Sequence, residues 1–167
     1  MLLRDVRDDD LRIFFEQERD PIANLLAAYP ARDLEAFMLH WRKKASGDTP
    51  CFIKTIMFDG CLAGSIECWA NDGKWLLGYW IGREFWGKGI ATAALREFLT
   101  YVKMRPLHAH VPSHNKASLR VLEKCGFTVS GQGSIFSEVH GHDVEEIHFT
   151  YHSEKSEFPA PKFFQEI

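Results

Sequence analysis

The first fifty residues place apolar and polar side chains with helical spacing. Apolar residues recur three and four positions apart, and charged residues fill the positions between them. Aspartates precede two of these patterns, at 8–10 and at 33, where a side-chain oxygen would accept hydrogen bonds from free helix N–H groups. The pattern predicts a strand over 2–6, helices over 11–19 and 34–44, and a shorter helix or a turn over 21–29.

Beyond residue 50 the apolar positions follow strand spacing, interrupted by two further helical stretches. Asp59-Gly60 and Asn71-Asp72-Gly73 are typical turn sequences, and Pro106 separates a helix from the strand after it. The pattern predicts strands over 51–58, 61–69, 74–81, 107–111, 128–139 and 143–151, with helices over 91–102 and 115–125. This order predicts a mixed α/β sheet with helices on both of its faces.

A glycine turn joins a strand to the helix of 91–102. Gly87 and Gly89 let a ligand approach the backbone closely, and the free N–H groups at a helix start attract an anion such as phosphate. Thr92 stands where the dinucleotide-binding pattern requires a third glycine or an alanine, and no P-loop motif occurs. The turn therefore indicates a phosphate that belongs to neither NAD nor ATP.

A second segment, from Asn115 to Phe127, combines a short amphipathic helix with a glycine at its end. Asn115 and Ser118 are three residues apart and share one helix face. Asn115 is also a typical N-cap residue, and both roles are compatible. The two segments form successive strand–helix units about thirty residues apart.

Together, Trp86-Gly-x-Gly-Ile-Ala-Thr and Asn115-x-x-Ser-x-x-x-Leu-x-Lys-x-Gly-Phe resemble the GNAT family of acetyl-CoA-dependent N-acetyltransferases. Within that family the chain is similar to the Rim-type branch, which acetylates N-terminal amines of ribosomal proteins, and the Gly-Tyr-Trp-Ile run at 78–81 fits that branch. The resemblance covers roughly residues 3–152. It implies a GNAT fold: a mostly antiparallel sheet of six to seven strands, helices on both faces, and a splay between strands four and five.

The resemblance also implies where acetyl-CoA binds. The pantetheine arm is expected in the splay, paired with the backbone of Trp80 and Ile81. The pyrophosphate is expected on the backbone N–H groups of Trp86, Gly87, Lys88, Gly89, Ile90 and Ala91. Lys88 and Arg83 can add positive charge, whereas Glu84 stands where the family usually has Arg or Gln.

Resemblance and chemistry together suggest the catalytic groups. Many relatives carry a Tyr general acid where this chain has Leu122, so Ser118 becomes the candidate for a hydrogen bond to the leaving thiolate, and Asn115 for a bond to the cofactor arm. An alkyl ammonium has a pKa near ~10 and must lose a proton before it attacks. Glu138, seven residues before Glu145-Glu146 as in the Rim-type pattern, is the favoured base.

Glu67 is the main rival for the base, because strand alternation can direct it toward the cleft. Leu76 replaces the strand-four Glu that many relatives carry. His110 and His140 are further candidates. Trp69 and Trp75 lie near a turn and can line an acceptor pocket.

Composition narrows the function classes further. A chain of 167 residues with 46% hydrophobic content suits one domain, expected over 1–152, with a partly ordered tail over 153–167. A formal charge of −3 and a longest basic run of Arg42-Lys43-Lys44 argue against nucleic-acid binding. No apolar stretch reaches membrane-spanning length and no signal pattern opens the chain, so a soluble, cytoplasmic protein is expected.

No metal site is expected either. The cysteines at 51, 61, 68 and 125 form no C-x-x-C pair, and the eight histidines show no convergent ligand set. The sequence therefore predicts an acetyltransferase acting on a protein N-terminal α-amine or a small-molecule amine. A non-catalytic acyl-CoA-binding or sensor module is the main alternative, and an unrelated α/β phosphate-binding protein is the other. A homodimer is plausible.

Overall fold

The computed structural model describes residues 1–152; the expectation for the tail, 153–167, lies outside the described residues. Seven strands form one sheet in the order β1-β2-β3-β4-β5-β7-β6. They are β1 (Leu2–Arg4), β2 (Cys51–Phe58), β3 (Cys61–Asn71), β4 (Lys74–Ile81), β5 (Leu107–Pro112), β6 (Thr128–Ser137) and β7 (His142–Tyr151). The predicted mixed sheet is therefore confirmed.

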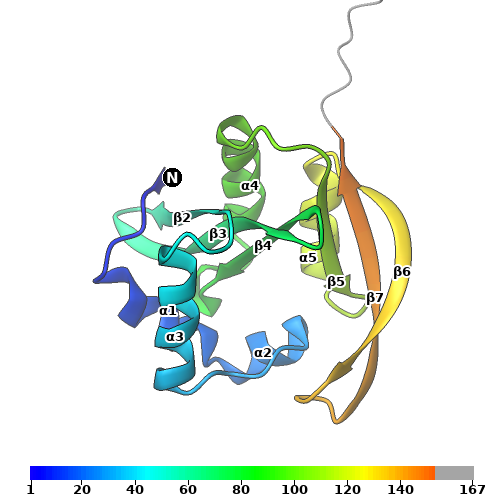
Figure 1. Ribbon diagram of the computed structural model, residues 1–167, viewed down its shortest axis with the longest axis horizontal. Helices are drawn as coiled ribbons and strands as arrows, with labels where there is room; N and C mark the ends of the chain where they lie inside the picture. Colours follow the sequence, from blue (N-terminus) through cyan, green and yellow to red (C-terminus); the bar gives the residue numbers. More distant parts are fainter. Residues whose placement is uncertain (153–167) are drawn as a thin grey trace, which may run out of the picture.

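Helices cover both faces of this sheet (Figure 1). They are α1 (Asp10–Glu18), α2 (Pro21–Ala27), α3 (Leu34–Ala45), α4 (Ile90–Tyr101) and α5 (Lys116–Lys124), with a 3-10 turn, η1, at Arg83–Phe85. On one face, Ala94, Leu95 and Phe98 of α4 and Leu122 of α5 are fully buried in the main core. On the other face a smaller core holds α1 and α3 against the sheet, with Phe14 and Trp41 stacked at 5.1 Å.

The sheet opens between β4 and β5. These two strands are parallel and pair only at Trp75↔Leu107 and Leu76↔His108, although β4 runs on to Ile81 and β5 to Pro112. Every other neighbouring pair is antiparallel. The splay that the family resemblance implies is thus present. Tyr79 lies in the part of β4 that pairs with β3 but not with β5.

Three local expectations need correction. Helix α1 begins at Asp10, and Asp9 at its N-cap makes no side-chain cap hydrogen bond. Asp10 is instead buried, and its two carboxylate oxygens accept hydrogen bonds from Arg4 at 2.6 and 2.7 Å. The charge of Arg4 compensates for the burial of the Asp10 carboxylate. Strand β6 ends at Ser137 rather than at 139, which leaves Glu138 in the turn that follows.

Within residues 1–152, no helix combines the length and the apolar composition that crossing a bilayer requires.

Candidate active site

The glycine turn presents a row of unpaired backbone donors. Within the described residues, the N–H groups from Gly87 to Thr92 donate to no backbone carbonyl, and the first helical bond runs from Ala93 N to Gly89 O. Gly87 and Gly89 both have φ of +74°, where a side chain is strained, yet a Cβ at either position would meet no atom within 4 Å. The backbone angle therefore requires glycine here, and the space beside the turn is open to a ligand.

Side chains around this turn are already engaged with the protein. Lys88 Nζ donates to the carbonyl oxygen of Glu84 at 3.0 Å, and Arg83 Nε lies 2.9 Å from an Asp20 carboxylate oxygen. Trp86 Nε1 donates to Ile81 O at 2.8 Å. Backbone donors rather than free side-chain cations are thus the anion-binding groups that the turn offers, which fits a pyrophosphate.

Ser118 meets a tyrosine that the sequence did not single out. The Oγ of Ser118 lies 2.8 Å from the hydroxyl of Tyr79, across the opening between α5 and β4. Burial raises the pKa of Tyr79 to about 12, so this hydroxyl stays protonated and can donate. Asn115 caps α5 by accepting from Ser118 N at 3.2 Å, which confirms its N-cap role. Only the Gly-Tyr-Trp-Ile run could have pointed to Tyr79.

Two adjoining cavities meet at β4. The first has a volume of about 510 Å³ and follows the glycine turn and α5. Its lining includes Trp80, Ile81, Trp86, Gly87, Gly89, Ile90, Ala91, Asn115 and Ser118, which are nine of the predicted cofactor residues. The second, of about 500 Å³, lies between β3, β4 and the helices α2 and α3. Both cavities are lined by Ala27, Tyr79 and Trp80, so together they reach from the glycine turn to the other side of β4.

The second cavity, called here the acceptor cavity, holds two paired carboxylates. Lys44 Nζ lies 2.8 and 2.7 Å from the two carboxylate oxygens of Glu67. Arg32 lies 3.1 Å from Glu18, whose pKa is raised by burial and by the charge of Glu67, against the opposing charges of Arg32 and Lys44. Glu67 thus faces the acceptor cavity, as strand alternation predicted, and Trp69 lines it as well.

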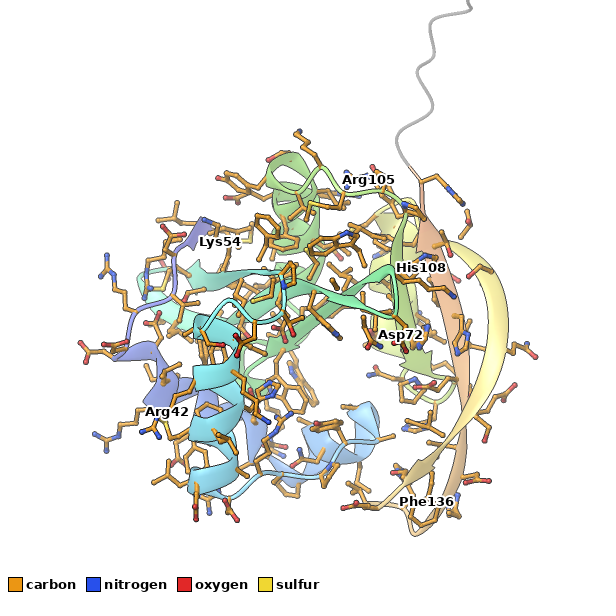
Figure 2. The ribbon with its side chains drawn as sticks, in the orientation of Figure 1. Arg42, Lys54, Asp72, Arg105, His108 and Phe136 are labelled. Atoms are coloured by element: carbon orange, nitrogen blue, oxygen red, sulfur yellow. The ribbon has the colours of Figure 1, made fainter. Side chains whose placement is uncertain are left out.

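Two further candidates, Glu138 and His140, lie elsewhere. Glu138 is exposed in the turn between β6 and β7 and lines neither cavity. The exposed Phe136, which Figure 2 labels, lies two residues before it in β6. His140 lies in the same turn and contacts Ser137 Oγ at 2.9 Å. The structure therefore brings Ser118, Tyr79 and Glu67 to adjoining cavities, and it does not bring Glu138 to Ser118.

Comparison with known proteins accords with this geometry. A family model described as an acetyltransferase (GNAT) domain matches residues 1–128. The protein named "Putative ribosomal N-acetyltransferase YdaF" from Bacillus subtilis (strain 168) is 32% identical over 119 residues, covering 66% of this chain and 64% of that protein. The chain thus matches slightly less than two thirds of that relative's length.

Solved structures share the fold. A ribosomal-protein-alanine N-acetyltransferase from Brucella melitensis superposes with a TM-score of 0.77 at 19% identity, covering 92% of this chain and 100% of that one. A spermidine N-acetyltransferase from Vibrio cholerae, in complex with CoA and spermine, gives 0.75 at 18% identity, covering 89% and 94%. Identities this low show the fold alone. The family match over most of the chain, on this splayed sheet, shows that the chain belongs to the GNAT acetyltransferase family.

Proposed function

We propose that this protein is an N-acetyltransferase that moves an acetyl group from acetyl-CoA directly to a primary amine. One observation carries the proposal: two cavities adjoin at Tyr79 and Trp80, and a row of free N–H groups lies along the first of them. This arrangement suits two substrates that meet at one point in the splay. Holding both in contact supplies much of the rate enhancement of such a reaction.

Acetyl-CoA fits the first cavity by its chemistry. The N–H groups of Gly87 to Thr92 would hold the pyrophosphate, and the unpaired edge of β4 would hold the pantetheine arm beside Trp80 and Ile81. When bound, acetyl-CoA supplies a thioester, whose sulfur is the leaving group. The hydroxyl pair of Tyr79 and Ser118 would donate a hydrogen bond to the negative charge that develops on this sulfur, and the 2.8 Å contact between the two hydroxyls supports this role.

The acceptor cavity would take the amine. Glu67 and Glu18 line it, each paired with a cation, Lys44 and Arg32 respectively. An ammonium group would therefore compete with these cations for the carboxylates. Relatives by sequence and fold carry names that refer to ribosomal proteins and to spermidine. We therefore propose a protein N-terminal α-amine or a small-molecule amine as the acceptor.

The test is thiol release from acetyl-CoA with a panel of N-terminal peptides and small amines. We expect release with at least one amine, and a loss of about tenfold to a hundredfold in kcat for Ser118→Ala and Tyr79→Phe, because each removes a donor near the leaving sulfur. Tyr101→Phe, at an exposed tyrosine at the end of α4, is the matched control and should keep full activity. Glu138→Gln and Glu67→Gln belong in the same series.

CoA affinity, measured by calorimetry, separates the possible failures. If CoA binds but no thiol is released from acetyl-CoA with any amine or with water as the acceptor, a non-catalytic acyl-CoA sensor is favoured. Absence of CoA binding would show that the glycine turn has another ligand, and the proposal would be wrong.

A further inference from the structure

The strand register places four positions in one row across the sheet. Glu67 pairs with Gly78, and His110 pairs with His148. Leu76 pairs with His108, so two residues further along these parallel strands Gly78 of β4 stands opposite His110 of β5, across the splay. Because alternate residues share a face, the side chains of Glu67, His110 and His148 lie on one face of the sheet. Glu67 lines the acceptor cavity on this face, and His110 and His148 lie outside its lining.

The surface between Glu67 and His110 is aromatic. Gly78 carries no side chain, and the ring of Trp69 lies over it, 3.2 Å from where a Cβ would be. The face of an indole ring attracts cations. An ammonium group over this ring would lie between the row positions of Glu67 on β3 and His110 on β5.

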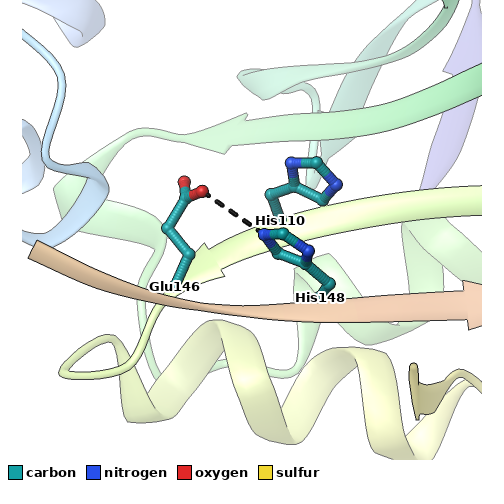
Figure 3. Close-up of side chains that lie close together, drawn as sticks. All are labelled: His110, Glu146 and His148. Carbon is teal, nitrogen blue, oxygen red and sulfur yellow. Dashed lines mark ion pairs between the residues drawn. The ribbon is translucent and has the colours of Figure 1, made fainter. Parts of the chain in front are cut away.

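His110 is held by a supporting pair on β7. Its ring stacks on that of His148, with 3.9 Å between ring centroids and 17° between planes. His148 Nε2 lies 3.6 Å from an oxygen of Glu146, which is 7% exposed (Figure 3). A Cβ at Gly133 would come within 2.8 Å of the His148 ring, so glycine on β6 makes room for this ring.

His110 is suited to accept a proton. Its pKa lies below the usual value for histidine because of burial first, and then because of the charges of His148, His108 and Lys74. It is therefore neutral near pH 7. His110, His148 and Glu146 have potential ligand atoms within 4.8 Å of one another, but the two imidazole rings lie nearly parallel, whereas ligands of one metal ion point their nitrogens at a shared centre.

We propose that His110 is the general base that takes the acceptor's proton, and that His148 and Glu146 are positioning residues that hold its ring toward the splay. This inference rests on the proposed function. The base is thus assigned to β5 on the acceptor face and to neither Glu138 nor Glu67, and Glu67 remains the partner of Lys44.

The proposed step balances in protons and bonds. The neutral imidazole of His110 takes one proton from the ammonium, and the freed nitrogen lone pair attacks the thioester carbonyl carbon. The carbon–nitrogen bond forms and the carbon–sulfur bond breaks, so CoA leaves as a thiolate. The new amide nitrogen gives its second proton to the thiolate, and His110 returns its proton to water.

The experiment compares His110→Gln with His142→Gln in thiol release, both with the best amine and with water as the acceptor. His142 is the matched control because it is an exposed histidine at the start of β7 whose Nδ1 contacts the carbonyl oxygen of Asp143 at 2.8 Å. We expect His110→Gln to lower kcat at least about a hundredfold with an unchanged KM for acetyl-CoA, since general bases contribute on this scale. His142→Gln should change kcat less than about threefold, because His142 lines neither cavity and is not among the groups that shift the pKa of His110.

The pH profile tests the supporting pair. His110 is faced by His108 on its own strand, by Lys74 of β4 and by His148 and Glu146 of β7. The β6 residues Gly131 and Gly133 lie against His148 and carry no charge. His148→Phe keeps a stacked ring but removes a charge that lowers the pKa of His110. The acid limb of the kcat profile should therefore move to higher pH, whereas a merely structural role would lower the rate without moving the limb.

Each outcome decides the question. A wild type that is active while His110→Gln keeps full activity would overturn the assignment of His110 and leave the proposed function standing. An unmoved acid limb in His148→Phe would overturn the role of the supporting pair. If the wild type binds acetyl-CoA but releases no thiol with either water or any amine as the acceptor, the proposed function is wrong, and the base assignment falls with it.

Discussion

Burial changes the proton chemistry of single side chains around the acceptor cavity, and His40 of α3 shows this most clearly. Burial, followed by the charges of Lys44, Arg32 and Lys43, lowers its pKa from 6.5 to about 4. The imidazole is thus neutral near pH 7, within a group of cations that oppose its protonation. A pKa lowered on folding makes protein stability depend on pH in a predictable direction.

We predict that His40→Gln makes the protein less sensitive to mild acid. In the wild type, the stability that the neutral imidazole contributes is fully present above pH 6.5, the ordinary pKa of histidine. It is lost as the pH falls toward the folded pKa of about 4, because the unfolded chain takes up the proton first. Between about pH 7 and about pH 5 the wild type should lose on the order of 1 kcal/mol more than the variant, allowing for partial solvent screening.

Urea unfolding at both pH values measures this difference. Because other groups titrate in both proteins, the comparison between them isolates His40. Equal losses in the two proteins would show that His40 has an ordinary pKa.

Part of the candidate active site could be predicted from residue types and their spacing in the sequence. Asn115 and Ser118 were recognisable because their spacing is local to one helix. Tyr79 was not, because its partner lies 39 residues away and only the approach of β4 to α5 brings the two hydroxyls to 2.8 Å.

At the scale of elements, the close approach of β3 to β4 sets the geometry of the splay. The pairing of β2 with β3 shifts register between Ile56 and Met57. On the other side of β3, Gly64 pairs with Ile81 of β4. A Cβ at Gly64 would sit 1.9 Å from the backbone oxygen of Trp80, a distance that no side chain allows. Glycine here lets the end of β4, beside the splay, remain paired to β3.

We predict that Gly64→Ala damages both stability and CoA binding. The added methyl group must push the Trp80 backbone away from β3, because that oxygen belongs to the main chain. A loss of about 2–4 kcal/mol in unfolding free energy is expected, as for overpacked core positions. Gly131→Ala is the matched control, since its Cβ would meet only a His148 atom at 3.9 Å.

Chemical denaturation gives the stability change, and calorimetry gives the affinity for CoA. Equal stability of Gly64→Ala and Gly131→Ala would contradict the close approach of Gly64 to Trp80.

At the scale of the whole molecule, α2 links the two halves of the sheet over the acceptor face. Ser137 at the end of β6 donates from its Oγ to the carbonyl oxygen of Ala28 at 3.3 Å. His114, in the loop before α5, contacts the carbonyl oxygen of Leu25 at 2.9 Å. Helix α2 faces the β6–β7 hairpin (Figure 1), and its last residue, Ala27, lines both cavities, so these contacts hold a wall of the site.

We predict that Ser137→Ala weakens acceptor binding without weakening acetyl-CoA binding. Ser137 is 1% exposed, and its loss removes the hydrogen bond that joins the hairpin to the end of α2. The KM for the amine should rise about threefold to tenfold, the equivalent of one hydrogen bond, while the KM for acetyl-CoA stays constant. Ser134→Ala, at an exposed position of the same strand, should change neither constant.

Hydrogen exchange of α2 adds an independent measurement. Faster exchange at Leu25 to Ala28 in Ser137→Ala is expected from the lost contact. Unchanged exchange together with an unchanged KM for the amine would show that the hairpin does not support α2.

The sequence by itself determined the elements, their order and the cofactor turn. Hydrophobic period, turn glycines and helix caps act over a few residues, so β2 and β4 began and ended where the pattern predicted. The composition of the glycine turn likewise predicted a backbone with unpaired donors, which we propose as the phosphate site, because φ and free N–H groups are local properties.

Only the tertiary structure decided which side chains share the site. Glu138 matched a spacing in the sequence but lies in an exposed turn, because β6 ends one residue earlier. Glu67 and His110 are 43 positions apart, and strand register alone puts them in one row on one face. Register and splay depend on the packing of the whole sheet, and no local pattern of residues encodes that packing.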